Sequence, residues 1–260
     1  MRRFHLIEIH EQDWMPESFR SATTDYLAHV EDVSKIYDPV VPVLVEAIRE
    51  SGADRVVDLC SGGAAPWGRL QGLVSEELGK SIEVVLTDLN PNRAAFEYVS
   101  EKLGAEISFS DAPVDVLDVP EGMSGFRTLF SSFHHFRPDD ARKILGDAVA
   151  KGEGIAVVEA THRSLVGILP MFHVPLIVWL VTPFIRPFRV SRLFWTYSVP
   201  LAPLIIGFDG IVSCLRTYSA GEMLELADKV GVEGYTWKSA AIRVKGMPMS
   251  YLVGYPTKVG

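Results

Sequence analysis

The sequence predicts an α/β fold built on a doubly wound, mostly parallel sheet, with a C-terminal antiparallel edge strand, an N-terminal helical cap and an apolar insertion. Between residues 55 and 160, short apolar runs alternate with helix-like stretches, which is typical of βαβ units and a parallel sheet. Two further strand-like runs close the sequence, joined by a turn too short for a parallel connection. Residues 164–208 interrupt this alternation with an almost uncharged apolar segment.

The first fifty residues predict helices. Apolar residues recur at three- and four-residue steps in Tyr26–Val33 and in Val40–Ser51, and Gly52 is placed to end the second helix. We therefore expect residues 1–51 to form a helical cap. Residues 52–260 are expected to form the main domain, with the insertion at 164–208.

The main domain follows a regular order of elements. Strands are expected at Arg55–Cys60, Ile82–Thr87, Glu106–Ser110, Arg127–Phe133, Gly154–Ala160, Tyr235–Val244 and Met249–Tyr255. Helices are expected at Pro66–Leu78, Asn92–Leu103, Pro138–Lys151 and Ala220–Val230.

Composition limits the possible partners. The 260 residues are 48% apolar and 22% charged, as in a globular protein, and the net charge is -8. An acidic chain lacks the clustered Lys and Arg of nucleic-acid binders, so no nucleic-acid partner is expected. Cys60 and Cys214 form no CxxC pair and no cluster with metal-ligand spacing. We expect no metal site and a reducing cytoplasm.

A glycine-containing loop follows the first predicted strand. The strand delivers Asp58 into a turn that holds Ser61, Gly62 and Gly63. Glycines there allow positive φ angles and a close approach of the backbone to a ligand, and a loop that enters a helix presents free N–H groups. The alternative is a plain strand-to-helix turn without a ligand.

Asp88 stands at the end of the next predicted strand. In dinucleotide-binding folds, an acid at this place binds the ribose hydroxyls. The alternative is that Asp88 caps the helix predicted at Asn92–Leu103. An NAD site would require G-x-G-x-x-G, which Cys60–Ala65 does not match.

Asp58-Leu-Cys-Ser-Gly-Gly-Ala64 resembles motif I of class I S-adenosylmethionine-dependent methyltransferases. In that family the loop wraps the methionine part of the cofactor. The resemblance implies a Rossmann-like fold, S-adenosyl-L-methionine as cofactor, and cofactor contacts from Asp58, Ser61, Gly62 and Gly63. The sequence departs from the family pattern because Cys60 and Ala64 replace the first and last glycines.

Three further segments resemble later motifs of the same family. Leu86–Pro91 resembles motif II, which implies that Asp88 holds the ribose and that Leu89 packs on adenine. Val114–Pro120 resembles the third motif, which implies that Asp115, or alternatively Asp118, binds the adenine amino group while Val116 lies under the ring. Leu129–Phe136 resembles the fourth-strand motif, whose end, at Ser131, faces the sulfonium.

His134 and His135 follow this fourth strand, where the methyl group would be transferred. Histidine titrates near neutral pH and suits a general base. We therefore predict both as catalytic. The alternative is that one ring packs and the other bonds to the backbone. His162 is a weaker candidate at the end of the fifth strand.

The apolar insertion has several possible roles. Ser164–Ile185 contains no acidic residue, lysine or arginine and has the length of a membrane span, but it is interrupted by prolines. It could cover the pocket as a lid for a lipophilic acceptor, or lie at a membrane interface with Arg186, Arg189 and Arg192 at the headgroups. A core helix pair or a dimer interface is the alternative. Asp209, Arg216 and Tyr218 beyond it could contact the acceptor or make structural contacts.

The sequence thus predicts a methyltransferase that acts on an apolar small-molecule or lipid-like acceptor. A cofactor-binding module without activity on the same fold, or a peripheral membrane-binding protein, is the alternative. The expected location is the cytoplasm, with possible peripheral membrane contact through 164–208.

Overall fold

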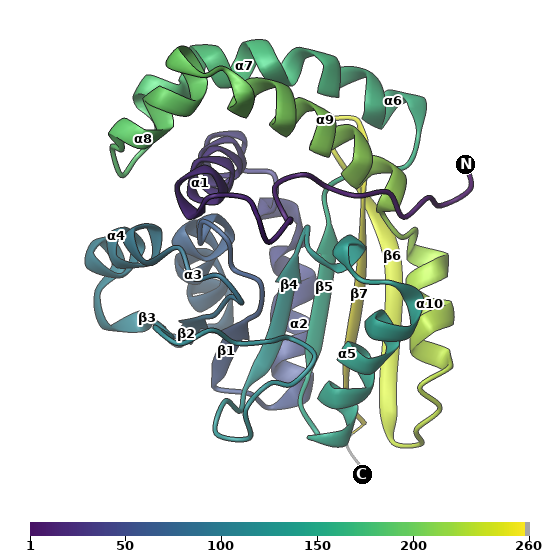
Figure 1. The fold of residues 1–260 in the computed structure, drawn as a ribbon. Coiled ribbons are helices and arrows are strands. Elements are labelled where there is room, and N and C mark those ends of the chain that lie inside the picture. Colours follow the sequence, from purple (N-terminus) through teal and green to yellow (C-terminus); the bar gives the residue numbers. More distant parts are fainter. Residues whose placement is uncertain (258–260) are drawn as a thin grey trace.

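The computed structural model describes residues 1–257, and its centre is a seven-stranded sheet with the order β3-β2-β1-β4-β5-β7-β6 (Figure 1). The strands are β1 (Arg55–Asp58), β2 (Glu83–Leu86), β3 (Ile107–Phe109), β4 (Phe126–Phe130), β5 (Ile155–Glu159), β6 (Tyr235–Val244) and β7 (Met247–Pro256). All neighbouring pairs from β3 to β5 are parallel, and β7 is antiparallel to both β5 and β6. The predicted fold class is confirmed. The antiparallel strand β7 lies one place inside the edge, which β6 forms.

Helices cover both faces of the sheet. The first face carries α2 (Val41–Ser51), α3 (Ala65–Leu78) and α4 (Arg93–Leu103), and the second carries α5 (Pro138–Ala150) and α10 (Ala220–Asp228). These helices agree with the predicted ones, and α2 ends at Gly52 with a left-handed φ of 74°. The helix α1 (Glu17–Ser34) starts earlier than predicted. Its first half is rich in serine and threonine, so only the spatial burial of Phe19 and Ala22 shows the helical face.

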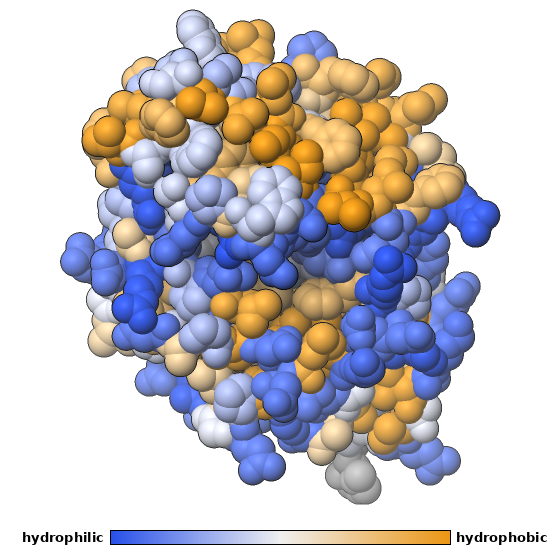
Figure 2. All heavy atoms as spheres, viewed as in Figure 1, coloured by the Kyte–Doolittle hydropathy of each residue, from blue (hydrophilic) through white to orange (hydrophobic). Residues whose placement is uncertain are grey.

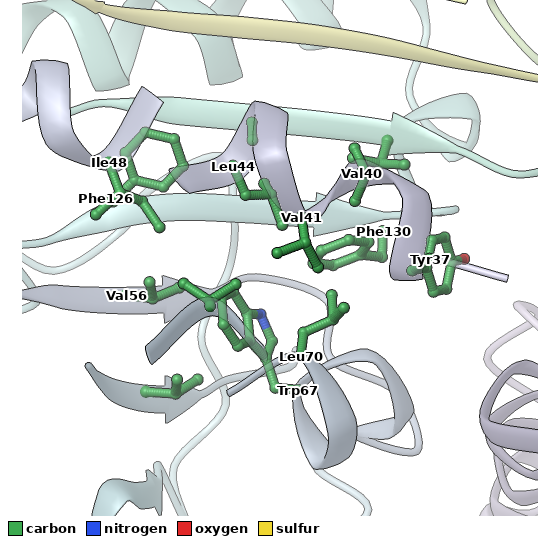
Figure 3. Packing of buried hydrophobic residues seen from close by; sticks show 14 of the residues in the cluster. Tyr37, Val40, Val41, Leu44, Ile48, Val56, Trp67, Leu70, Phe126 and Phe130 are labelled. Atoms are coloured by element: carbon green, nitrogen blue, oxygen red, sulfur yellow. The ribbon is translucent and has the colours of Figure 1, made fainter. Parts of the chain in front are cut away.

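Figure 3 shows how α2 packs on the sheet. Val41, Leu44 and Ile48 of α2 lie against β4, which carries Phe126 and Phe130, and all five side chains are buried. The helical cap predicted for residues 1–51 is therefore smaller than expected. It comprises an N-terminal arm (residues 1–16) and α1, whereas α2 belongs to the sheet's own helical cover.

The apolar insertion forms a helical layer across the carboxyl end of the strands, over α1 (Figure 1). Its elements are α6 (Leu165–Ile168), η4 (Leu169–His173), α7 (Val174–Val181), η5 (Thr182–Phe184), α8 (Val190–Leu193), η6 (Phe194–Ser198) and α9 (Leu201–Arg216). The insertion reaches past the predicted boundary at 208 because α9 continues to Arg216. Gly207 and Gly210 allow α9 to approach Pro175 and Met171, since a Cβ at either glycine would come within 3 Å of them.

The lower side of this layer packs on α1. Val178, Ile185, Ala202 and Ile206 form a cluster with Phe19, Tyr26 and Met15. Arg192 reaches inward to Asp25 of α1 at 2.5 Å, and both side chains are buried. The layer is thereby fixed to the body along one side.

The N-terminal arm runs between the helical layer and the carboxyl ends of the strands (Figure 1). The N–H of Phe4 donates to the carbonyl of Leu215 at 3.0 Å. The N–H groups of Ile9 and His10 donate to the two oxygens of Asp209 on α9, at 2.8 and 3.0 Å. The arm therefore lies along α9 and covers the ends of β4 and β5.

Candidate functional site

The loop after β1 has the backbone of a glycine turn at three positions. Cys60, Gly62 and Ala64 have φ angles of 59°, 52° and 61°, in the left-handed region. For the two residues with a side chain this conformation costs roughly 1–2 kcal/mol each. These are the three glycine positions of the motif that the loop resembles. The backbone of the turn is therefore preserved at Cys60 and Ala64, although these two residues are not glycines.

Gly63 is required by a close approach of α1. A Cβ at this residue would lie 2.6 Å from the carbonyl oxygen of Thr24 and 2.6 Å from the Cβ of Ala28. Backbone cannot move away as a flexible side chain can, so a larger residue would push α1 off the loop. α1 thus bounds one side of the loop.

Asp58 is buried beneath this loop. Its Oδ1 accepts hydrogen bonds from Thr128 Oγ1 at 2.6 Å and from Trp67 Nε1 at 3.1 Å. Burial raises the pKa of Asp58 to about 7, against the opposing effect of these hydrogen bonds. Ser61 Oγ donates to the carbonyl of Asp58 at 2.9 Å. Both residues tie the loop to β1, β4 and α3.

Asp88 joins the first loop to the second. Its Oδ2 accepts from the N–H of Gly62 at 2.9 Å, and its Oδ1 accepts from the N–H of Asn90 at 2.8 Å. Burial raises its pKa, and the backbone donors oppose that effect. Asn92, not Asp88, caps α4, because its side chain accepts from the N–H of Ala95. The alternative reading of Asp88 as a helix cap is therefore wrong.

The third predicted segment lies beside Asp88. The N–H of Val114 donates to the carbonyl of Asp88 at 2.9 Å. Asp115 is exposed, and its Oδ1 accepts from the N–H of Leu117 at 2.9 Å. Val116 is buried in the cluster that covers the second face of the sheet, so its side chain contributes to the core. Leu89 is largely exposed next to Asp88.

These loops fit a nucleoside cofactor. The turn presents the left-handed backbone that lets N–H groups approach a ligand, and the Asp88 carboxylate, with Asp115 nearby, stands at the same edge. Hydroxyl donors of a ribose suit the remaining lone pairs of a carboxylate. Ser131 lies on the other side, with a φ of 42°, and its Oγ accepts from Tyr37 Oη at 2.8 Å and from the N–H of Ala160 at 3.1 Å.

A buried pair of His134 and Glu159 stands at the ends of β4 and β5. The backbone N–H of His134 donates to Glu159 Oε1 at 2.9 Å, and Nδ1 lies 2.8 Å from Glu159 Oε2. Because a carboxylate only accepts, Nδ1 carries a proton, and Nε2 is the ring atom that can gain or lose one. His134 is 2% exposed, and its Nε2 has no hydrogen-bond partner.

The N-terminal arm closes this pair from outside. Glu8 Oε1 lies 3.7 Å from His134 Nε2, and Glu8 Oε2 has no hydrogen-bond partner. His135 stacks beside His134, with 4.2 Å between ring centroids, and its Nδ1 contacts Glu11. Arg216 donates to the carbonyl of His135 at 2.7 Å and to Glu11 Oε2 at 2.9 Å. We call Glu8, Glu11, His134, His135, Glu159 and Arg216 the histidine cluster.

Charge in the histidine cluster favours a protonated histidine. Burial lowers the pKa of His134, but the charge of Glu159, its hydrogen bond and the charge of Glu8 outweigh burial, so the pKa is raised. Burial also opposes ionisation of Glu11, yet contacts with His135 and Arg216 hold its pKa below the usual range. The raised pKa makes His134 a stronger base than a free imidazole.

The donor atoms of Glu8, His134 and His135 all lie within 4.8 Å of one another, close enough to hold a metal ion. Arg216 Nη1 already lies 3.4 Å from Glu8 Oε1 and supplies positive charge there. Because this guanidinium already compensates the charge of Glu8, we interpret the group as a site that binds protons and not a metal ion.

The weaker candidates have structural partners. His162 Nδ1 lies 2.8 Å from the Oγ of Ser164, which caps α6. Asp209 anchors the arm, and Tyr218 Oη donates to the carbonyl of Phe136 at 2.9 Å. Arg216 supports the histidine cluster through the backbone.

Sequence reasoning missed the acids of the histidine cluster. Glu159 gave one signal, since it ends the otherwise apolar run Ile155–Val158. Glu8 and Glu11 gave none, because their contacts join residues more than a hundred positions apart. A surface depression lined by residues 51–55 and 152–154 lies at the opposite, amino-terminal end of the strands and has no part in this site.

No protein-family model matches the sequence, and no curated protein sequence is significantly similar to it. Solved structures do resemble the fold. An O-methyltransferase family protein from Burkholderia thailandensis matches with a TM-score of 0.52 at 16% identity, over 92% of this chain and 59% of that chain. Human N-acetylserotonin methyltransferase in complex with S-adenosylmethionine matches with a TM-score of 0.51 at 14% identity, over 94% and 57%.

An O-methyltransferase from neocarzinostatin biosynthesis, in complex with S-adenosyl-L-homocysteine and 1,4-dihydroxy-2-naphthoic acid, also matches. Its TM-score is 0.51 at 14% identity, over 90% of this chain and 56% of that chain. The chain thus spans less than three fifths of the length of these three proteins. At such identities the likeness establishes the fold, which is that of class I methyltransferases.

Proposed function

We propose that this protein is an S-adenosylmethionine-dependent O-methyltransferase that acts on a hydroxyl group of an apolar small-molecule or lipid-like acceptor. The observation that carries the proposal is the His134–Glu159 pair with its unpartnered Nε2, at the strand ends where this fold places its chemistry. Two of the structural neighbours described above carry the name O-methyltransferase, which supports the choice of a hydroxyl.

The glycine turn, Asp88 and Asp115 would hold the cofactor. The Asp88 carboxylate would accept the ribose hydroxyls, and the left-handed turn from Cys60 to Ala64 would face the methionine part. When bound, S-adenosylmethionine supplies an electrophilic methyl group on a sulfonium. α1, which lies on Gly63, would limit how far the cofactor can move from the loop.

His134 would act as the general base. Its Nε2 would accept the proton of the acceptor hydroxyl as that oxygen takes up the methyl group, which the cofactor would supply together with sulfur as the leaving group. Glu159 holds the ring by two hydrogen bonds and keeps the proton on Nδ1. Such a positioned base contributes typically about 10²–10⁴-fold to a rate.

An apolar acceptor fits the surroundings of this base. The helical layer above it has no acidic residue or lysine between Ser164 and Phe208. Its arginines Arg189 and Arg192 point to Asp25 rather than to the histidine cluster. Because Glu8 of the arm lies against Nε2, entry of an acceptor requires the arm to move.

The test is formation of S-adenosylhomocysteine with a panel of apolar hydroxyl acceptors, compared with amines of matched shape. Methyl transfer to hydroxyls that is lost in Glu159→Gln supports the proposal. A thermal shift should also be larger with S-adenosylhomocysteine than with NADH, by mass action on the folded state. Cofactor binding without turnover of any acceptor would instead indicate a binding module without activity, and preference for NADH would refute the cofactor assignment.

A further inference from the structure

The outer side of the helical layer is apolar and exposed. Figure 2 shows hydrophobic residues gathered over this layer, above a body that is largely hydrophilic. The exposed large side chains are Leu165, Val166, Leu169, Phe172, Leu176, Ile177, Trp179, Leu180, Phe184, Phe188, Val190, Phe194, Tyr197, Leu201, Leu204 and Phe208. We call this set the outer face. Soluble proteins rarely expose so large a contiguous apolar surface without a partner.

The first helical run of the layer is not a buried core helix. Leu165–Phe184 is a 20-residue helical run with a mean hydropathy of 2.1, of which only 17% is buried. A core helix with this composition would be mostly buried. The run has the length and composition of a membrane span. It nevertheless lies flat across the carboxyl end of the strands, packed along α9 and α1 (Figure 1). The other apolar stretch of the helical layer is made of two helical segments, Val190–Ser198 and Leu201–Arg216, whose axes are bent by 85° from each other.

The outer face offers almost no hydrogen-bonding groups. Among exposed residues of 165–208, side chains with hydrogen-bonding groups are limited to His173, Trp179, Arg186, Tyr197 and Ser198. Of these, Tyr197 Oη already donates to the carbonyl of Trp179 at 2.6 Å. Protein–protein interfaces carry about one hydrogen bond per 100–200 Å². A protein partner would find few such contacts here, whereas the acyl region of a bilayer requires none.

Charge also separates this region from the rest of the molecule. The chain has a net charge of -8, but Ser164–Phe208 contains three arginines and no acidic residue. Arg189 and Arg192 are paired with Asp25, while Arg186 is exposed and forms no ion pair within the described residues. The side of the molecule that carries the apolar surface is therefore the side that does not repel anionic headgroups.

We propose that the outer face docks on a lipid bilayer, with α6–α7 and α9 lying in the plane of the interface and not crossing it. Trp179 and Tyr197, whose rings meet edge to face, would lie at the depth of the headgroups, which aromatic residues of this kind favour. In this orientation the arm and the histidine cluster lie directly below the layer. The docking itself does not depend on methyl transfer, and its test uses no cofactor.

The experiment is flotation of the full chain with vesicles of phosphatidylcholine, alone or mixed with phosphatidylglycerol. The wild type should float with both and remain bound at high salt, because apolar burial drives the binding. The triple variant Phe172→Glu, Leu176→Glu, Leu180→Glu places acids at four-residue steps on the outer face. Its bound fraction should fall at least about tenfold. Val33→Glu with Val232→Glu, both exposed outside the layer, is the matched control and should bind as the wild type does.

A second measurement reports the depth at which the outer face lies, and its central comparison, between shallow and deep bromines, is made on the wild type. Brominated lipids should quench the fluorescence of the wild type more than that of Trp179→Phe, and shallow bromines more than deep ones. Four outcomes overturn the proposal: no flotation with either vesicle, binding that is lost in high salt, stronger quenching by deep bromines, which indicates a span, or a wild-type dimer that the triple variant converts to a monomer without any vesicle binding. The last outcome would assign the outer face to a second copy.

Discussion

The histidine cluster and the outer face both depart from the usual rule that charged residues are exposed and apolar residues are buried, but in opposite directions. In the cluster, charged side chains are removed from water: Glu8, Glu159 and Arg216 are at most 2% exposed. On the outer face, large apolar side chains are exposed to water: Phe172 and Phe184 are at least 66% exposed. The two regions are separated by little more than α9 and the arm (Figure 1).

The difference shows how each region can be tested. Burial of charge costs free energy unless partners compensate, and the cluster supplies partners for almost every atom except His134 Nε2 and Glu8 Oε2. Exposed apolar area costs solubility and is compensated only by a partner outside the chain. Removing a cluster residue should therefore change chemistry or folding, whereas removing an outer-face residue should change only association.

The largest effect is expected from His134→Gln. Glutamine keeps a donor for Glu159 but removes the base, so turnover should fall by about 10²–10⁴-fold while binding of S-adenosylhomocysteine stays the same. Initial rates and calorimetric titration measure the two quantities. His162→Gln is the matched control, since its ring bonds to Ser164 outside the cluster. Equal rates for wild type and His134→Gln would remove His134 from the mechanism.

Asp25→Asn should have the next largest effect, on stability. The carboxylate pairs with Arg192 and Arg189 beneath the helical layer, at 2.5 and 3.1 Å. Its loss leaves two guanidinium groups without an anion, which typically costs about 3–5 kcal/mol for a buried pair. Urea unfolding measures the change, with the exposed Asp32→Asn as the control. A loss below 1 kcal/mol would mean that the layer is held by apolar contacts alone.

Asp88→Ala should weaken binding of the cofactor by about 1.5–3 kcal/mol, from the loss of charged hydrogen bonds to the ribose. Titration with S-adenosylhomocysteine measures the affinity, and Glu121→Ala serves as a control with an exposed acid. If the affinity stays within about twofold while the protein remains folded, Asp88 only joins the two loops through Gly62 and Asn90.

The pH dependence of stability should distinguish the cluster from the outer face. The pKa of His134 is raised in the folded protein, so its contribution to stability is fully present below the unfolded-state value of about 6.5. That contribution is lost as pH rises through the raised pKa. Urea unfolding across this range should show a decline that His134→Gln lacks. Substitutions on the outer face should leave the decline unchanged.

The smallest effect is expected from Cys60→Gly. Glycine removes the strain of a left-handed φ of 59°, roughly 1–2 kcal/mol, but increases the entropy of the unfolded chain by about 0.4–1 kcal/mol. A net gain between about 0 and 1.6 kcal/mol should result, measurable as a small rise in Tm. Destabilisation would show that packing of the half-buried Cys60 thiol contributes more stability than the strain removes.

The predictable parts of the molecule are the local ones. The strands and the left-handed turn after β1 can be predicted because each depends on a few consecutive residues whose pattern is visible in the chain. The first half of α1 was missed because its apolar residues are few, and its burial arises only when the helical layer packs on it. Glu8 and Glu11 could not be predicted, since their meeting with His134, His135 and Arg216 depends on the path of the arm.

The path of the arm also fixes when the site can be completed during synthesis. The arm pairs with Asp209 across 200 positions of sequence and with Arg216 across 205. Glu8 and Glu11 therefore leave the ribosome long before the residues that hold them are made. Until α9 emerges, the ends of β4 and β5 have no cover. The histidine cluster is assembled only when the last quarter of the chain returns to the first.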